Sequence, residues 1–363
     1  MAEQLIRNDA NVEHNGQDGL NGGDNGAHDF PSAIIRRPRW RSYTAFVLSG
    51  GGARGALQVG ALRALLEQGE YPDVVVGTSI GAWNGACLAL RPSIEGVEWL
   101  ADAWISTNST RLLLGVDPLP NSPQQAINVG KVLAALRRIA AGNPSLYSDS
   151  GLRQFINRFL KDVTFEDMAI PLRIIAADIT NSTRAIFSSG PVVPAVLASG
   201  AIPGVFPPVT IGDHVYVDGG ALDNASIETA LMLGARRIFV LDVGYDNANV
   251  VAPLLPADSS SRHTTPRSAR TSSVHTMVAV LERTANVMSR YQLTRALERL
   301  PRGIETHVLR LGANISGGTL DFDKAAMWIE LGYAGAYEYL REAQRLPPSV
   351  SAPLNVATVA DAR

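Results

Sequence analysis

The chain has 363 residues, of which 46% are hydrophobic and 18% are charged, and its formal net charge is −2 at pH 7. This apolar fraction is sufficient for a sizeable core and excludes a chain that is disordered throughout. The near-neutral charge balance gives no reason to expect nucleic-acid binding. Cys87 is the only cysteine, which excludes an intramolecular disulfide and a zinc site built from several cysteines.

The first 41 residues are rich in Asn, Gly and Asp and lack the apolar segment of a secretory signal, so we expect a disordered polar tail. Two charge-free stretches, 74–90 and 185–212, contain glycines or prolines that would interrupt a membrane-spanning helix. The sequence therefore predicts no transmembrane helix and a cytoplasmic location. Four arginines surround Trp40 and could attract anionic lipid head groups, which leaves peripheral membrane contact open. The alternative is a solvated basic linker. The four are Arg36, Arg37, Arg39 and Arg41.

Beyond the tail, the spacing of apolar residues predicts strands that alternate with helices. The expected strands are residues 43–49, 73–76, 172–179, 184–187, 214–217, 237–243 and 305–311. The expected helices are residues 55–68, 81–90, 94–105, 129–141, 150–160, 193–198, 227–233, 274–300 and 323–345. This alternation is typical of an α/β sandwich with a largely parallel central sheet.

Changes in composition suggest the organisation of the chain. A Ser/Thr/Pro/Arg-rich tract is expected to be a mobile loop, and the Pro/Ala-rich end is expected to be flexible. The predicted parts are the tail 1–41, an α/β core 42–244, the mobile loop 245–273, a helix–strand–helix unit packing on the core at 274–345, and a flexible tail 346–363.

Gly77-Thr78-Ser79-Ile80-Gly81 fits the G-x-S-x-G pattern and lies between a predicted strand and an Ala-rich helix. In this strand–turn–helix setting the serine occupies a strained turn that exposes its hydroxyl. The flanking glycines allow strand and helix to approach each other closely. Ser79 is therefore a candidate nucleophile, with an N-capping serine in an ordinary glycine-rich turn as the alternative.

Residues 50–55, Gly-Gly-Gly-Ala-Arg-Gly, also follow a predicted strand and open a helix. A dinucleotide site would need an acidic residue at the tip of the next strand, and a Walker A loop would need Gly-Lys-Ser/Thr; the sequence has neither. What remains is a row of backbone N–H groups suited to negative charge, which beside a serine nucleophile would form an oxyanion hole. Arg54 opposes the helix dipole, so we expect it to orient this loop or to line a pocket, with a solvated surface arginine as the alternative.

A serine nucleophile needs a base. His275 and His307 follow in the order of a Ser–Asp–His triad, but neither is expected in a short loop after a strand. Asp218 is the better candidate, because a predicted strand ends at it and Gly219-Gly220 form a tight turn open to substrate. A structural turn aspartate is the alternative.

Together these motifs resemble those of the patatin-like phospholipase family. Residues 50–55 resemble its G-G-G-x-[RK]-G loop, 77–81 its G-x-S-x-G elbow, and 218–220 its D-G-[GA] motif. Residues 198–209, ASGAIPGVFPPV, resemble the stretch that precedes the D-G-[GA] strand. The similarity covers about 43–244, and no motif residue departs from the family pattern.

The resemblance implies a three-layer α/β/α sandwich related to cytosolic phospholipase A2. It implies a dyad of Ser79 as nucleophile and Asp218 as base, which cleaves phospholipids or other lipid esters through an acyl-serine intermediate. No cofactor and no metal are implied, and the sequence shows no calcium-binding module. The implied oxyanion donors are Gly50, Gly51 and Gly52. The implied supporting motif residues are Arg54, Gly55, Gly77, Gly81, Gly219 and Gly220.

Two other functions stay open at this point. A conventional α/β-hydrolase would use His275 or His307 in a triad, and a lipid-binding protein could keep the fold without catalysis. The apolar segment 185–212 is the best candidate for an acyl pocket, with ordinary core packing as the alternative. The natural lipid, the positional preference and the oligomeric state are left open.

Overall fold

The computed structural model describes residues 43–106, 142, 144–145, 147–245, 266–313, 315, 318–319, 321–345 and 356–358. Only the backbone is described for 266–279, 281, 344–345 and 356–358. The predicted tail 1–41, the predicted helix 129–141 and residues 246–265 of the predicted loop lie outside the described residues.

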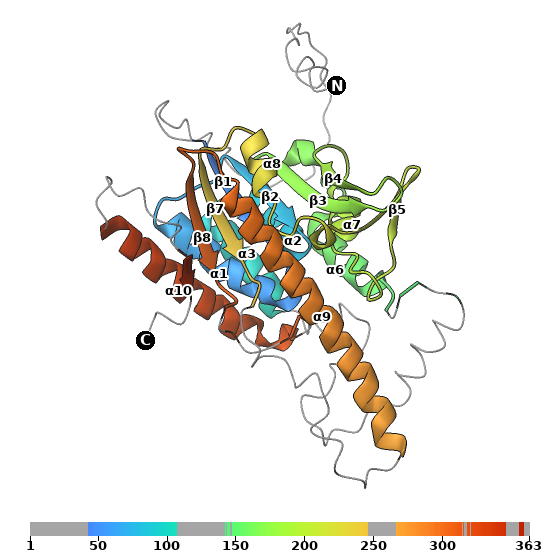
Figure 1. The fold of residues 1–363 in the computed structure, drawn as a ribbon. Helices are drawn as coiled ribbons and strands as arrows, with labels where there is room; N and C mark the ends of the chain where they lie inside the picture. Colours follow the sequence, from blue (N-terminus) through green and yellow to red (C-terminus); the bar gives the residue numbers. More distant parts are fainter. Residues whose placement is uncertain are drawn as a thin grey trace, which may run out of the picture. The chain divides into compact units, whose positions relative to one another are not determined.

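A central sheet of nine strands organises the described residues (Figure 1). Its strands pair in the order β5 (Val209–Ile211), β6 (His214–Asp218), β3 (Leu172–Asp178), β2 (Val74–Thr78), β1 (Thr44–Leu48), β7 (Arg237–Asp242), β8 (Glu305–Arg310) and β9 (Val356–Thr358), and β4 (Thr183–Phe187) also pairs with β3. The pairs from β3 through to β9 are parallel, whereas the pairs that involve β4, β5 and β6 are antiparallel. The sheet is therefore mostly parallel, with an antiparallel edge.

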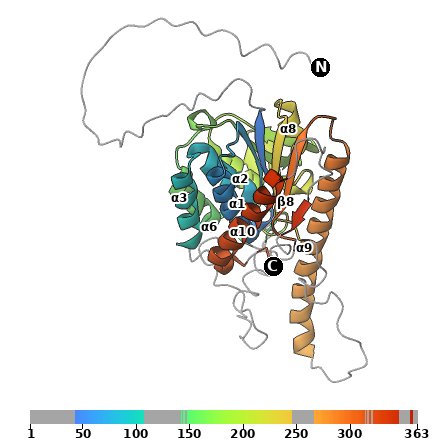
Figure 2. The same ribbon diagram turned by 90° about the vertical axis from the view of Figure 1, so that its left-hand side faces the viewer.

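Helices cover both faces of this sheet (Figure 2). Successive side chains of β1 enter different cores: Phe46 and Leu48 enter one, and Ala45 and Val47 enter the other. The mixed α/β sandwich expected from the sequence is thus confirmed. The first face carries α1 (Gly55–Glu67), α2 (Ile80–Leu90), α3 (Ile94–Ile105), α6 (Ser150–Leu160), α7 (Val192–Ser199) and α10 (Ala325–Arg345), and the second carries α8 (Ile227–Met232) and α9 (Pro266–Glu298).

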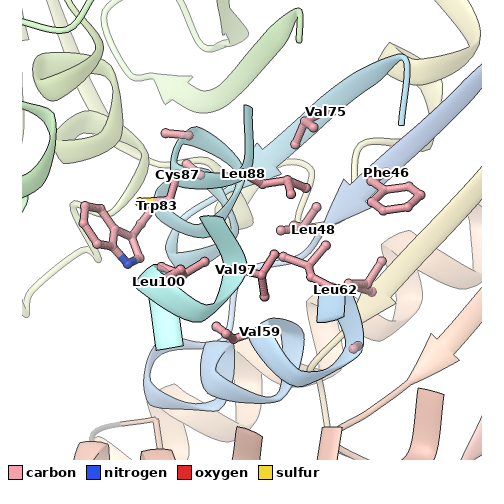
Figure 3. Packing of buried hydrophobic residues seen from close by; sticks show 14 of the residues in the cluster. Phe46, Leu48, Val59, Leu62, Val75, Trp83, Cys87, Leu88, Val97 and Leu100 are labelled. Atoms are coloured by element: carbon pink, nitrogen blue, oxygen red, sulfur yellow. The ribbon is translucent and has the colours of Figure 1, made fainter. Parts of the chain in front are cut away.

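The larger core joins α1, α2 and α3 to β1 and β2 (Figure 3). Cys87 lies fully inside it, and burial raises the pKa of its thiol, so this cysteine acts as a small apolar side chain. Across the described segments, no helix is both long and apolar enough to cross a bilayer. The side chains labelled in this core are Phe46, Leu48, Val59, Leu62, Val75, Trp83, Cys87, Leu88, Val97 and Leu100.

Two segments of the predicted chain organisation, the mobile loop 245–273 and the flexible tail 346–363, contain regular structure. Helix α9 begins at Pro266, so residues 266–273 are helical and do not belong to the predicted mobile loop. Proline is favoured in the first turn of a helix, where its missing N–H is not needed. Strand β9 lies within the predicted flexible tail 346–363, and its formation depends on pairing with the distant strand β8, which local sequence does not reveal.

Helices α1 and α10 pack with their backbones in contact. A Cβ on Gly60 would lie 1.8 Å from the carbonyl oxygen of Ile329, and a Cβ on Gly332 would lie 2.0 Å from that of Leu57. Helices approach this closely only where no side chain stands between them. α10 also contacts the 3₁₀ turn Gly52–Arg54 that follows β1. The packing of α10 on α1 therefore supports that turn.

Replacing Gly60 with alanine should destabilise the protein. The added methyl group must displace the α10 backbone, and this overpacking should cost about 2 kcal/mol or more, beyond the roughly 1 kcal/mol that alanine gains in helix propensity. Thermal denaturation should show a midpoint lower by about 4–8 °C. Ala334→Ser, on the exposed side of α10, is the control and should shift the midpoint little. An unchanged midpoint for Gly60→Ala would refute the backbone contact.

Candidate active site

Two strands that are distant in sequence end face to face along one edge of β3. β2 runs parallel to β3, and its last residue, Thr78, lies opposite Ile175. β6 runs antiparallel to β3, and its last residue, Asp218, lies opposite Ala176. Because β4 pairs with these same two β3 residues on the other edge, β2 and β6 share one edge of β3 and their carboxyl ends meet. This meeting places Ser79, the residue after β2, beside Asp218.

The Ser79 hydroxyl donates a hydrogen bond to Asp218 Oδ2 over 2.6 Å. The other carboxylate oxygen, Oδ1, accepts the N–H of Gly220 over 2.8 Å, so the orientation of the carboxylate is fixed from both sides. Ser79 itself has φ 56° and ψ −123°, a strained conformation for a residue with a side chain. The turn thus presents the serine hydroxyl to the base at a cost in backbone energy.

The glycines around the dyad are required by close approach of the backbone. A Cβ on Gly77 would lie 2.4 Å from the carbonyl oxygen of Gly81, and a Cβ on Gly81 would lie 2.2 Å from that of Leu48. A Cβ on Gly219 would lie 2.4 Å from the carbonyl oxygen of Ile175. These positions therefore tolerate no side chain unless the strands separate.

Burial sets the basicity of Asp218. Loss of water around the carboxylate raises its pKa to about 6, while the hydrogen bonds from Ser79 and from Gly220 N–H act in the opposite direction. At neutral pH the carboxylate is mostly ionised, yet it accepts a proton far more readily than an exposed aspartate does. Asp218 is thus suited to general-base chemistry.

The glycine loop after β1 lies against the nucleophile. A Cβ on Gly50 would be 2.9 Å from Ser79 Cβ. The Gly50 N–H donates to Asn224 Oδ1 over 3.0 Å, and the Ala53 N–H donates to the carbonyl oxygen of Thr319 over 2.7 Å. Of the three predicted oxyanion donors, Gly50 therefore already has an acceptor in this conformation.

The next two amides of the loop are available. Among the described residues, the N–H groups of Gly51 and Gly52 make no hydrogen bond. Gly52 has φ +58°, and a Cβ there would lie 2.3 Å from Thr319, so only glycine fits. Backbone amides of this kind, in a loop whose first residue lies against Ser79, are suited to stabilise an oxyanion that forms on a substrate.

Arg54 lies inside the protein beneath the glycine loop. It is 2% exposed, its Nη2 is 3.5 Å from Glu282 Oε1, and its guanidinium lies 4.3 Å from the centroid of the Tyr245 ring. Burial lowers its pKa, and the nearby Glu282 acts against this shift. These contacts tie the loop to α9. The adjacent Gly55 is packed against Ile80 Cγ1, which would lie 2.5 Å from an added Cβ.

Sequence reasoning missed two residues that hold the site. The Ser79 N–H donates to Ser199 Oγ over 2.7 Å, and the Ser199 hydroxyl donates to the carbonyl oxygen of Ile175 over 2.5 Å. This serine lies in the segment 198–209, where a serine within an apolar helix was the available signal. Asn224, which binds Gly50, lies six residues after Asp218 and had no local signal.

No histidine side chain of the described residues hydrogen-bonds to Ser79 or Asp218. His307 lies on β8, three strands away from β2, and its ring nitrogens contact Tyr339 Oη and Glu305 Oε1. The side chain of His275 is outside the described part. Within the described residues, no group of three or more His, Cys, Asp or Glu side chains is arranged to hold a metal ion.

Three side chains of the predicted acyl-pocket segment 185–212 contribute to core packing. Val192, Val196 and Leu197 are buried in the larger core together with residues of α2 and α6. For these three side chains the alternative interpretation, ordinary core packing, describes the structure.

Comparison with known proteins gives one family. The family model described as patatin-like phospholipase matches residues 46–231, just over half of the chain. Patatin-like phospholipase domain-containing protein 7 of Rattus norvegicus is 32% identical over 202 residues, which cover 55% of this chain and 13% of that protein. Neuropathy target esterase sws of Drosophila melanogaster is 31% identical over 217 residues, which cover 59% of this chain and 14% of that protein. The chain thus matches only a small part of each relative.

Solved structures with a similar arrangement include VipD from Legionella pneumophila, with a TM-score of 0.40 and 17% identity. That match covers 83% of this chain and 67% of VipD. Human GIVD cytosolic phospholipase A2 in complex with methyl gamma-linolenyl fluorophosphonate has a TM-score of 0.30 and 13% identity, and covers 55% of this chain and 40% of that chain.

Asp218→Asn should stabilise the folded protein at pH 8. Because the pKa of this carboxyl is raised on folding, the folded state binds the proton more tightly than the unfolded chain does, and stability is lost as the pH rises from about 4 to about 6. Removing the charge should therefore raise the free energy of unfolding by about 2–3 kcal/mol above pH 6 and by little at pH 4. Urea denaturation at both pH values measures this.

The exposed Asp213→Asn is the control and should change the free energy of unfolding equally little at both pH values. A stabilisation by Asp218→Asn that is the same at pH 4 and pH 8 would contradict the raised pKa.

Proposed function

The chain belongs to the patatin-like phospholipase family, and we propose that it is a serine hydrolase that cleaves carboxylic esters of lipids. The observation that carries this proposal is the 2.6 Å hydrogen bond from the Ser79 hydroxyl to Asp218, made from a strained turn that lies against the glycine loop. The names of the relatives, phospholipase and esterase, support hydrolysis of lipid esters.

Acylation begins when Ser79 Oγ attacks the carbonyl carbon of the ester while Asp218 accepts the hydroxyl proton. The carbonyl oxygen gains the negative charge that the carboxylate loses, and the N–H groups of Gly51 and Gly52 donate hydrogen bonds to it. Collapse of this intermediate breaks the ester C–O bond. Asp218 returns the proton to the departing alcohol, and the acyl group stays on Ser79.

Deacylation repeats these steps with water. Asp218, ionised again, takes a proton from a water molecule whose oxygen attacks the acyl carbon, and the same amides stabilise the second oxyanion. Breakdown releases the fatty acid and returns the proton to Ser79 Oγ. Each proposed half-reaction uses one carboxylate, that of Asp218, and two amide donors, those of Gly51 and Gly52. The proposed substrates are phospholipids or lysophospholipids, with surface contact to the lipid aggregate that presents them.

Ser79→Ala and Asp218→Asn should each lower the rate of p-nitrophenyl butyrate hydrolysis by about a thousandfold or more, because the nucleophile or its base is lost. A fluorophosphonate probe should label the unaltered protein at Ser79, which peptide mapping by mass spectrometry identifies. The exposed Ser188→Ala is the matched control and should retain full activity and labelling. Hydrolysis at the original rate by both site variants would disprove the mechanism.

The pH dependence of kcat/KM should show a single acidic limb with a midpoint near pH 6. The ionised carboxylate is the active form, and burial raises its pKa to about 6, so activity should fall as the pH drops through this value. Initial rates from pH 4.5 to 8 test this. A midpoint near pH 4 would indicate an unperturbed aspartate, and a limb near pH 6 that persists in the residual activity of Asp218→Asn would assign it to another group.

A further inference from the structure

Four polar residues share the face of α9 that is turned to the site. Glu282, Asn286, Ser289 and Gln292 follow one another at intervals of four, three and three residues, and each is partly buried. We call these four residues the α9 polar stripe. The other face of the same helical segment is exposed to solvent. Its exposed residues include Thr284, Val287, Met288 and Tyr291.

Ser289 and Gln292 hold Asn224. The Asn224 side-chain amide donates to Ser289 Oγ over 2.5 Å, and the Asn224 backbone N–H donates to Gln292 Oε1 over 3.2 Å. Gln292 Nε2 also donates to the carbonyl oxygen of Ala221, in the turn that follows Asp218, over 3.3 Å. α9 is thereby tied to both Asn224 and the turn of the base.

Asn224 in turn holds the glycine loop. Its Oδ1 accepts the Gly50 N–H over 3.0 Å, and its Nδ2 donates to the Gly50 carbonyl oxygen over 3.3 Å. That carbonyl and the Gly51 N–H belong to one planar trans peptide and point in opposite directions. A hydrogen bond that fixes the Gly50 carbonyl therefore also fixes the direction of the Gly51 N–H.

The two other stripe residues bind the remaining loops at this end of the sheet. Asn286 binds both backbone groups of Tyr245, which lies after β7. Its Oδ1 accepts the Tyr245 N–H over 3.0 Å, and its Nδ2 donates to the Tyr245 carbonyl oxygen over 2.6 Å. Glu282 Oε1 accepts the N–H and hydroxyl of Thr319 over 2.9 and 2.5 Å. Thr319 is the residue whose carbonyl oxygen accepts the Ala53 N–H.

Among the side chains of α9 that the structure describes, apolar anchoring begins at Leu293, after the stripe. Leu293 is buried in the second core, and Ala296, Leu297 and Leu300 pack against it. Over 282–292 no side chain of the helix is buried, and this segment contacts the loops through hydrogen bonds and the ion pair of Glu282 with Arg54. The polar stripe is thus the means by which this segment contacts the site.

We propose that Asn224 and Ser289 are positioning residues for the oxyanion hole. Ser289 orients the Asn224 amide, Asn224 orients the Gly50–Gly51 peptide, and the α9 polar stripe keeps the loops after β1, β6 and β7 in register with the dyad. This proposal rests on the proposed ester hydrolysis. It assigns a positioning role to a helix that carries none of the family motifs.

The test compares Ser289→Ala and Asn224→Asp with Thr284→Ala, which deletes a hydroxyl from the exposed face of α9. With p-nitrophenyl butyrate, kcat should fall about tenfold for Ser289→Ala and about a hundredfold for Asn224→Asp, whose carboxylate opposes the Gly50 carbonyl. KM should change by less than about twofold, because the substrate does not touch either residue. Ser289→Thr, which keeps the hydroxyl, should recover most of the rate, and Thr284→Ala should behave as the unaltered protein.

Hydrogen–deuterium exchange gives a readout that does not depend on activity. The Gly50 amide should exchange faster in Ser289→Ala than in Thr284→Ala, because its acceptor is no longer held. Equal exchange and equal kcat in these two variants would overturn the proposal, as would a loss in Ser289→Ala that appears in KM alone. Should the unaltered protein hydrolyse no ester, the proposed function fails, and the exchange rates still decide whether Ser289 positions the loop.

Discussion

The site depends on the meeting of β2 and β6 along a single edge of β3. Two strands whose proposed catalytic residues are 139 positions apart end opposite adjacent residues of β3, Ile175 and Ala176. This arrangement leaves Ser79 with a strained backbone and Asp218 buried. The sheet and its two cores must offset both costs, since neither conformation would persist in an isolated segment.

The glycine loop after β1 is held from both layers of helices. On the side of α1 and α2, Gln58 Nε2 donates to the carbonyl oxygens of Ser49 and Leu241, and Asn84 Nδ2 donates to that of Gly55. On the side of α9, Asn224 binds both backbone groups of Gly50. A loop of consecutive glycines has high conformational freedom, so its order has to be supplied by partners outside it. Buried amide side chains supply it here: Gln58 and Asn84 donate to backbone carbonyls, and Asn224 satisfies a backbone donor and a backbone acceptor at once.

Local features were predictable from the sequence because their causes are local. The strand–turn–helix context located Ser79, a strand end followed by glycines located Asp218, and α3 and α6 begin and end where apolar spacing predicts. Ser199 and Asn224 escaped detection because they act on residues 120 and 174 positions away. The same holds for the α9 polar stripe: a row of polar residues on a helix is usually a solvated face, and only the tertiary structure shows that this one is turned inward.

Burial also explains how one carboxylate can serve where many hydrolases use histidine. An unperturbed histidine has a pKa near 6.5, and desolvation brings that of Asp218 to about 6, so the two bases have similar strength near neutral pH. They differ in the charge that follows proton transfer. With histidine, an imidazolium and an oxyanion form together from neutral groups. With Asp218, a single negative charge moves from the carboxylate to the oxyanion, and no new ion pair is created. In a site with little water, moving one charge toward two fixed amides requires less reorganisation than separating two charges. The lack of a neighbouring histidine among the described side chains is therefore compatible with efficient catalysis, provided that the amides of Gly51 and Gly52 are held in place before the charge arrives.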